Sequence, residues 1–257
     1  MVYRTMPFRV TSYAVSDIGR VRDENQDAWM GLEKEHFFAI ADGMGGHNGG
    51  RVAAEETLRH LSFLIKEKYA SNSLSLDDGE EMELFLSDAI QEVNKAIYWM
   101  GQHDARLEGM GCTLCCVLFL NKQLVIGHVG DSRIYCLRRG CLVQLTKDHS
   151  LLRELIDMGQ LNEQGAREFN LKNIITKAIG IADEVHPAMN SIQVDEGDLF
   201  LLCSDGLSDL ISPEQIEECL KADCSLEEQG KQLVEMANEA GGKDNITVLL
   251  LKAEEEI

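Results

Sequence analysis

The sequence predicts an α+β fold, with stacked antiparallel sheets in the middle and helices packed outside them. Two segments, 50–69 and 80–100, repeat apolar residues at helical spacing, which predicts a pair of amphipathic helices. Short apolar runs typical of strands come next, at 113–120, 124–129, 134–137 and 142–145. The connections between these runs are too short for crossovers, so they join antiparallel neighbours and exclude a doubly wound parallel sheet over this region.

The segments on either side of this block fit the same layout. Residues 8–15 are expected to form an entering strand, and the polar run 16–27 after it resembles a loop. Residues 151–158 predict a short helix that Gly159 ends, because glycine adopts the left-handed conformation common after helices. The polar, irregular run 160–173 is typical of a mobile surface segment.

The last part of the chain predicts two more helices and a final strand. Ser212 and Ser225 are each followed three residues later by Gln or Glu, which is the pattern of a capping box at a helix N-terminus. Gly241 is expected to end the second of these helices, and the apolar run 246–251 follows it. Residues 71–79 form a polar loop between the earlier helix pair.

Composition limits the class of protein and its partners. The 257 residues are 44% hydrophobic and include only 3 prolines, with no linker-like stretch, so we expect a single domain over 1–257. The net charge of −20 argues against a nucleic-acid or anionic-membrane partner, because both need a basic surface. No signal-peptide-like segment or membrane-length apolar run is present, and the 8 cysteines suit reduced thiols, so we expect a cytoplasmic protein.

Three aspartates lie where apolar runs meet polar ones. Asp42 follows the run 37–41, Asp205 follows a second apolar run, and Asp244 directly precedes the final one. An Asp-Gly turn closing a hairpin is the ordinary explanation for Asp42 taken alone. Three carboxylates at strand ends brought to one sheet edge would repel one another unless a cation neutralised them. Oxygen ligands of this kind favour Mg²⁺ or Mn²⁺.

Two further candidates have ordinary alternatives. Asp131, in a Gly-Asp-Ser-Arg turn, is either a fourth ligand or a turn acid paired with Arg133. The charged run 16–27 is either a solvated loop or a segment in which Arg22 grips a tetrahedral oxyanion while Gln26 or Asp27 faces the metal. Cys112 and Cys115 have the spacing of a zinc motif, but their odd separation in a strand directs the thiols to opposite faces, so no zinc site is expected there.

A series of short motifs, in a fixed order along the chain, resembles that of a known protein family. It comprises GRVR with NQD at 19–27, DGMGGH at 42–47, GCT at 111–113, GDSR at 130–133, TKDHS at 146–150, IITKAIG at 174–180, SDGLSD at 204–209 and GKDN at 242–245. Each motif alone is weak, but together they run in order through nearly the whole chain. The sequence resembles the metal-dependent protein phosphatase family (PPM), the type 2C serine/threonine phosphatases, and most closely its bacterial branch.

The resemblance implies a four-layer α-β-β-α sandwich, two antiparallel sheets flanked by helix pairs. It implies a core of two Mn²⁺ or Mg²⁺ ions, bridged by Asp42, with Asp205 and Asp244 on one ion and the Gly43 carbonyl on the other. A third, looser ion corresponds to Asp131 and Asp205, with Asp209 nearby.

Other positions of the resemblance concern the substrate. Arg22 corresponds to the phosphate-binding arginine, and Asp27 lies next to metal-bound waters. Residues 151–173 correspond to a flap that influences substrate choice. Gln26 stands where some relatives carry a glutamate ligand, so it is expected to act only through water and to leave the second ion more weakly bound. Met44 stands where some relatives have a histidine acid, and that role is not transferred to His47.

The implied activity is hydrolysis of phosphoserine and phosphothreonine in proteins by direct attack of a metal-bridging water. Phosphorylated proteins, including a serine/threonine kinase, are the expected partners of a monomeric enzyme. One alternative is a catalytically inactive PPM-fold binding module in kinase signalling, against which the presence of all four aspartates argues. Another two-metal hydrolase, such as a nuclease, is disfavoured by the acidic composition.

Overall fold

The computed structural model describes residues 8–46, 49–71, 79–162, 165 and 174–255. Two antiparallel sheets form its centre. The β1 sheet contains, in spatial order, β1 (Phe8–Asp17), β11 (Ile246–Glu255), β10 (Leu199–Cys203), β7 (Arg133–Arg138) and β8 (Cys141–Gln144). The β3 sheet contains β2 (Asp27–Leu32), β3 (Phe37–Met44), β5 (Leu114–Leu120), β6 (Gln123–Val129) and β9 (Ala188–Gln193), with β4 (Gly111–Cys112) paired to β3.

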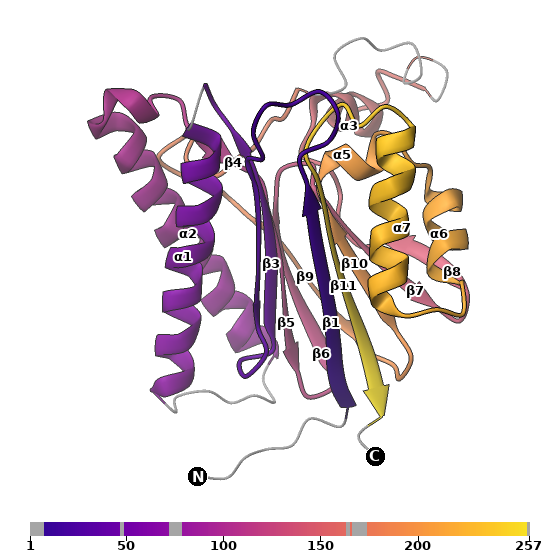
Figure 1. The fold of residues 1–257 in the computed structure, drawn as a ribbon. Coiled ribbons are helices and arrows are strands. Elements are labelled where there is room, and N and C mark those ends of the chain that lie inside the picture. Colours follow the sequence, from indigo (N-terminus) through magenta and orange to yellow (C-terminus); the bar gives the residue numbers. More distant parts are fainter. Residues whose placement is uncertain (1–7, 47–48, 72–78, 163–164, 166–173, 256–257) are drawn as a thin grey trace.

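Helices cover the outer face of each sheet (Figure 1). The helices α1 (Gly49–Ala70) and α2 (Gly79–His103) pack on the β3 sheet, while α6 (Pro213–Leu220) and α7 (Leu226–Glu239) pack on the β1 sheet. Shorter elements are α3 (Leu151–Asp157), α5 (Asp205–Ser208) and a 3₁₀ turn at Ala105–Leu107. The predicted four-layer α-β-β-α sandwich is therefore confirmed.

Three apolar interfaces hold the four layers together. One cluster lies between α1, α2 and the β3 sheet, a second lies between the two sheets, and a third lies between the β1 sheet and the helices α6 and α7. Successive side chains of strand β5 point to opposite faces of the sheet, so the strand contributes to two of these clusters. Cys116 and Leu118 belong to the first cluster, and Val117 and Phe119 belong to the second. Burial on both faces explains why this strand is apolar throughout.

Most predicted elements are present, with small shifts at their ends. The entering strand, the two long helices and the final strand lie where the sequence placed them. Both predicted capping boxes form, at Ser212 and Ser225. Cys112 and Cys115 lie in different apolar clusters, as their odd separation predicted. Strands β2 and β9 were not predicted, and the loop 72–78 lies outside the described residues.

The prediction that every short connection joins neighbouring strands was wrong at one place. The runs at 124–129 and 134–137 became β6 and β7, but β6 belongs to the β3 sheet and β7 to the β1 sheet. Gly130 enters the connecting turn with a φ of +107°, a conformation that suits glycine. The chain thus crosses from one sheet to the other at Asp131, which places this residue between the two sheets.

Among the helices that the structure describes, none has the length and apolar character needed to cross a bilayer.

Candidate metal centre

The three strand-end aspartates lie close enough for Asp205 and Asp244 to repel the Asp42 carboxylate. Two elements near these residues, β4 and α5, lie at the upper edge of the sheets in Figure 1. Asp42 lies near the end of β3, Asp205 opens α5 directly after β10, and Asp244 precedes β11. The pKa of Asp42 is raised well above its ordinary value, first by burial and then by repulsion from Asp27, Asp205, Asp131 and Asp244. Their mutual repulsion shows that five carboxyl groups share one space.

Strand β2 presents Asp27 beside Asp42. The two residues are paired across β2 and β3. Asp27 Oδ2 accepts hydrogen bonds from Ser204 Oγ at 2.8 Å and Thr247 Oγ1 at 2.6 Å, while its Oδ1 is buried without a hydrogen-bond partner. Burial raises the pKa of Asp27 to about 6. Two hydroxyls therefore orient this carboxylate beside Asp42.

The backbone at Gly43 passes so close to α1 that a side chain has no room. A Cβ on Gly43 would lie 2.2 Å from the Gly50 carbonyl oxygen and 2.6 Å from that of Gln26. Gln26 itself donates its backbone N–H to Asn245 Oδ1 at 2.8 Å, and its side-chain amide bonds Glu24 Oε1 at 2.9 Å. Close packing thus explains the glycine at position 43, and the predicted ligand role of the Gly43 carbonyl stays a prediction.

Asp131 is not paired with Arg133, so the ordinary explanation for this turn is wrong. Arg133 instead bonds Asp148 through two nitrogens, Nε to Oδ1 at 3.0 Å and Nη2 to Oδ2 at 2.7 Å. Asp131 is 9% exposed, and its Oδ1 is buried without a hydrogen-bond partner. Burial, followed by repulsion from Asp148, raises the pKa of Asp131 to about 6.

Asp205 and Asp209 lie on one turn of the chain. The Asp209 N–H donates to the Asp205 carbonyl at 2.8 Å, at the end of α5. Burial raises the pKa of Asp205 to about 8, and repulsion from Asp131 and then Asp209 adds to the effect. Asp205 thus interacts electrostatically with both Asp42 and Asp131, and its predicted role as a ligand shared between ions stays a prediction.

Arg22 lies at the mouth of the cluster. Its Nη2 donates to Asp244 Oδ2 at 2.6 Å, and 55% of the side chain is exposed. The pKa of Arg22 is raised by this hydrogen bond, with smaller contributions from Asp42 and Asp205. The predicted phosphate-binding role of this exposed guanidinium stays a prediction.

The donor set fits hard cations. Within the described part of the chain, no group of three or more His, Cys, Asp or Glu side chains is arranged so that it could hold a metal ion. Three buried carboxylate oxygens nevertheless lack hydrogen-bond partners, on Asp27, Asp131 and Asp205. Buried acids without partners raise one another's pKa values, and divalent ions with oxygen ligands would remove that cost. The ligand roles of these residues stay predictions.

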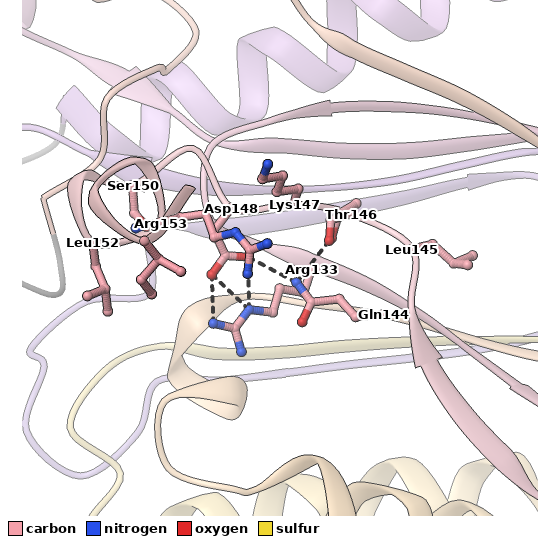
Figure 2. Close-up of a pocket in the computed structure, with 10 residues that line it drawn as sticks. Arg133, Gln144, Leu145, Thr146, Lys147, Asp148, Ser150, Leu152 and Arg153 are labelled. Carbon is pink, nitrogen blue, oxygen red and sulfur yellow. Dashed lines mark hydrogen bonds and ion pairs between the residues drawn. The ribbon is translucent and has the colours of Figure 1, made fainter. Parts of the chain in front are cut away.

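A cavity of about 530 Å³ opens beside the Asp131 turn, next to α3. Figure 2 shows Arg133 bonded to Asp148 in its wall, with Lys147, Ser150 and Arg153 around it. Helix α3 begins the segment predicted as a flap, 151–173. Residues 163–164 and 166–173 of that segment lie outside the described residues, as does His47, whereas Met44 ends β3.

Sequence reasoning missed the residues that hold the acids in place. Thr113 Oγ1 accepts the Asp42 N–H at 3.0 Å and bonds Ser132 Oγ at 2.7 Å, which joins β3 to the Asp131 turn. Ser204 and Thr247 hold Asp27 in a similar way. The available signal was a hydroxyl residue next to or inside an otherwise apolar run, as at Thr113, Ser204 and Thr247.

Comparison with known proteins gives consistent matches. The model of the protein phosphatase 2C family matches residues 20–250. The serine/threonine phosphatase stp of Listeria innocua is 39% identical over 240 residues, covering 92% of this chain and 93% of the relative. The Mycobacterium tuberculosis serine/threonine phosphatase PstP/Ppp superposes with a TM-score of 0.85 at 36% identity, over 96% of this chain and 99% of that chain.

A second PstP structure, of the catalytic domain in complex with two manganese ions, superposes with a TM-score of 0.83 at 35% identity. It covers 96% of this chain and 100% of that chain. The family model spans most of the residues, and the relatives are matched along almost their whole length. The chain belongs to the protein phosphatase 2C family of metal-dependent protein phosphatases, as its ordered motifs predicted.

Proposed function

We propose that the protein is a metal-dependent phosphatase that hydrolyses phosphoserine and phosphothreonine in proteins. The observation that carries this function is the set of mutually repelling carboxyls with Arg22 at their mouth. Asp42, Asp131, Asp205 and Asp244 are all present, and the named relatives are phosphatases. Both facts favour an active enzyme over an inactive binding module, and the family excludes the nuclease alternative.

The chain's own residues have separable tasks in this reaction. Arg22 receives the phosphate through its planar fork of donors. Asp42, Asp205 and Asp244, with the Gly43 carbonyl, would hold two Mn²⁺ or Mg²⁺ ions, and Asp131 with Asp205 and Asp209 a third. Such ions supply a water of lowered pKa and positive charge for the phosphoryl oxygens. Asp27, oriented by Ser204 and Thr247, accepts hydrogen bonds from water in the site, and Gln26 acts through water.

The setting of the reaction is also part of the proposal. Phosphoprotein substrates follow from the family, and we propose that a serine/threonine kinase is among them. All eight cysteines are free thiols, which suits a reducing cytoplasm. The layers share continuous apolar interfaces, which supports one domain over 1–257. We propose that this domain acts as a monomer.

A metal titration of phosphopeptide hydrolysis tests the function. Protein stripped with EDTA is mixed with a phosphothreonine peptide, and phosphate release is followed as Mn²⁺ or Mg²⁺ is added. We expect no release before addition, turnover after it, and no turnover by Asp42→Asn at any metal concentration. Release that is indifferent to EDTA, or no release with either ion, would contradict the proposal.

A further inference from the structure

His149 binds the turn that carries Asp131 at two points. The Gly130 N–H donates to His149 Nδ1 at 3.0 Å, and the His149 backbone N–H donates to the Gly130 carbonyl at 2.8 Å. Both polar groups of Gly130 are therefore paired with one residue from a different part of the chain. The hydrogen bond to the His149 side chain depends on a single ring nitrogen, Nδ1.

Gly130 is the residue whose conformation sets where Asp131 lies. Its φ of +107° lets the chain leave β6 and enter the other sheet. A Cβ at this position would lie 2.6 Å from Thr113 Cγ2, so Gly130 also packs directly against the threonine that holds the Asp42 N–H. Any movement of the Gly130 peptide would shift the neighbouring Asp131 carboxylate.

The backbone around His149 is also hydrogen-bonded to residues 174–176, which come after α3 in the sequence. The Thr176 N–H donates to the His149 carbonyl at 2.8 Å, and the Leu151 N–H donates to the Ile174 carbonyl at 2.8 Å. Residues 149–151 and 174–176 thus run side by side and close the two ends of the segment that begins with α3. His149 is the shared residue between this closure and the Asp131 turn.

The ring is held in the form that this contact needs. Because the Gly130 N–H donates to Nδ1, that nitrogen must carry a lone pair and the proton of the neutral ring lies on Nε2. Burial, with the nearby charge of Lys177, lowers the pKa of His149 to about 4. The ring also stacks on the buried His128, with centroids 4.8 Å apart and planes 22° apart.

We propose that His149 is a positioning residue that sets the metal affinity of the Asp131 position through its Nδ1 hydrogen bond to Gly130. This inference rests on the proposed function only in taking Asp131 as a ligand of the third ion. Among the described residues the His149 ring bonds Gly130 and stacks on His128, with no hydrogen bond to Asp42, Asp205 or Asp244, so its removal should leave the ions held by those three aspartates in place.

Two substitutions separate the hydrogen bond from the packing of the ring. In His149→Asn, the amide Oδ1 takes the place of Nδ1 as an acceptor, but the ring stack on His128 is lost. In His149→Phe, the stack is kept and the acceptor is lost. His103→Asn serves as a control, because His103 is an exposed histidine at the end of α2.

Isothermal titration of the stripped proteins with Mn²⁺ measures binding without any substrate. We expect a tighter and a weaker phase in wild-type protein and in His103→Asn. His149→Asn should keep the weaker phase, and His149→Phe should weaken it by about ten-fold with the tighter phase unchanged, since a buried N–H is left unpaired. Turnover of His149→Phe should recover at high Mn²⁺.

The opposite pattern overturns the inference. If Phe preserves the weaker phase while Asn loses it, ring packing rather than the hydrogen bond is what matters. If the wild-type protein shows no weaker phase, or both variants match it, His149 positions no ligand. The tighter phase and the wild-type turnover report separately on the phosphatase itself, so failure of the proposed function would be seen in different measurements.

Discussion

Replacing Asp131 with Asn should stabilise the metal-free protein, although Asp131 is a predicted ligand. Asp131 is 9% exposed, its Oδ1 has no hydrogen-bond partner, and burial raises its pKa to about 6 from an ordinary value of 3.8. The folded protein therefore holds the proton of Asp131 more tightly than the unfolded chain does. Ionising this group at neutral pH costs folding free energy, which a neutral amide does not incur.

The size of the effect follows from the two pKa values. A difference of about two pH units corresponds to roughly 3 kcal/mol at most, and in a chain of this size that raises the Tm by up to about 10 °C. The stability that the carboxyl contributes is fully present below pH 3.8 and is lost as the pH rises through about 6. The advantage of Asp131→Asn should thus be absent at pH 4 and complete above pH 6.

Asp148→Asn is a matched control with the opposite sign. Asp148 accepts three hydrogen bonds from two nitrogens of Arg133, whose side chain is 22% exposed, so the amide would leave a partly buried guanidinium without its counter-charge. Breaking such a pair costs about 3 kcal/mol. Both variants change one aspartate near the same cavity to the same residue, but only the Asp148 carboxylate is bonded to an arginine and to the Gln144 amide.

Thermal unfolding followed by circular dichroism in EDTA, at pH values from 4 to 7, measures both variants. Added Mn²⁺ should then stabilise the wild-type protein more than Asp131→Asn, because the ion neutralises the carboxylate that the variant lacks. If Asp131→Asn lowers the Tm at pH 7 in EDTA as Asp148→Asn does, the account of Asp131 as a strained, unpartnered acid is incorrect.

Asp42→Ala and Asp205→Ala should each abolish Mn²⁺-dependent phosphate release, while Asp88→Ala on the exposed side of α2 should leave it unchanged in the same assay. Arg22→Ala should raise KM more than it lowers kcat in steady-state kinetics, and unchanged values of both would place the phosphate elsewhere. Ser225→Ala removes the α7 capping box, so it should cost about 1 kcal/mol in denaturant unfolding and leave kcat alone.

The sequence predicted the layers because each element carries a local signal. The apolar stripes of α1 and α2, and the capping boxes before α6 and α7, depend on residues within one or two turns. Strand β9 was missed because four of its six residues are polar or exposed, including Asn190 and Ser191, so it lacks an apolar run. A sheet-edge strand of this kind is recognised through its pairing with β6 rather than through its own side chains.

The sheet crossing after β6 was missed for a different reason. A connection as short as 130–132 normally returns a strand to its neighbour, and the change of sheet depends on Gly130 and on which partners β6 and β7 find elsewhere. Strand β6 pairs with β5 and β9, whereas β7 pairs with β10 and β8. Those pairings are long-range, and no residue within the turn specifies them.

The aspartates of the candidate site could be predicted from the sequence, but the residues that orient them could not. An aspartate at the end of an apolar run is visible in the sequence, whereas the hydroxyl that orients it, such as Thr247 for Asp27, lies 220 residues away.

Such distant support explains how the fold tolerates the acids. Three continuous apolar interfaces stabilise the sandwich, and the carboxyls lie at its edge, where backbone and hydroxyl groups fix them despite their mutual repulsion. An acid that is held rigidly without a cationic partner destabilises the metal-free protein and favours a divalent ion for the same electrostatic reason. A variant that relaxes the cluster should therefore gain stability in EDTA and lose Mn²⁺ affinity together.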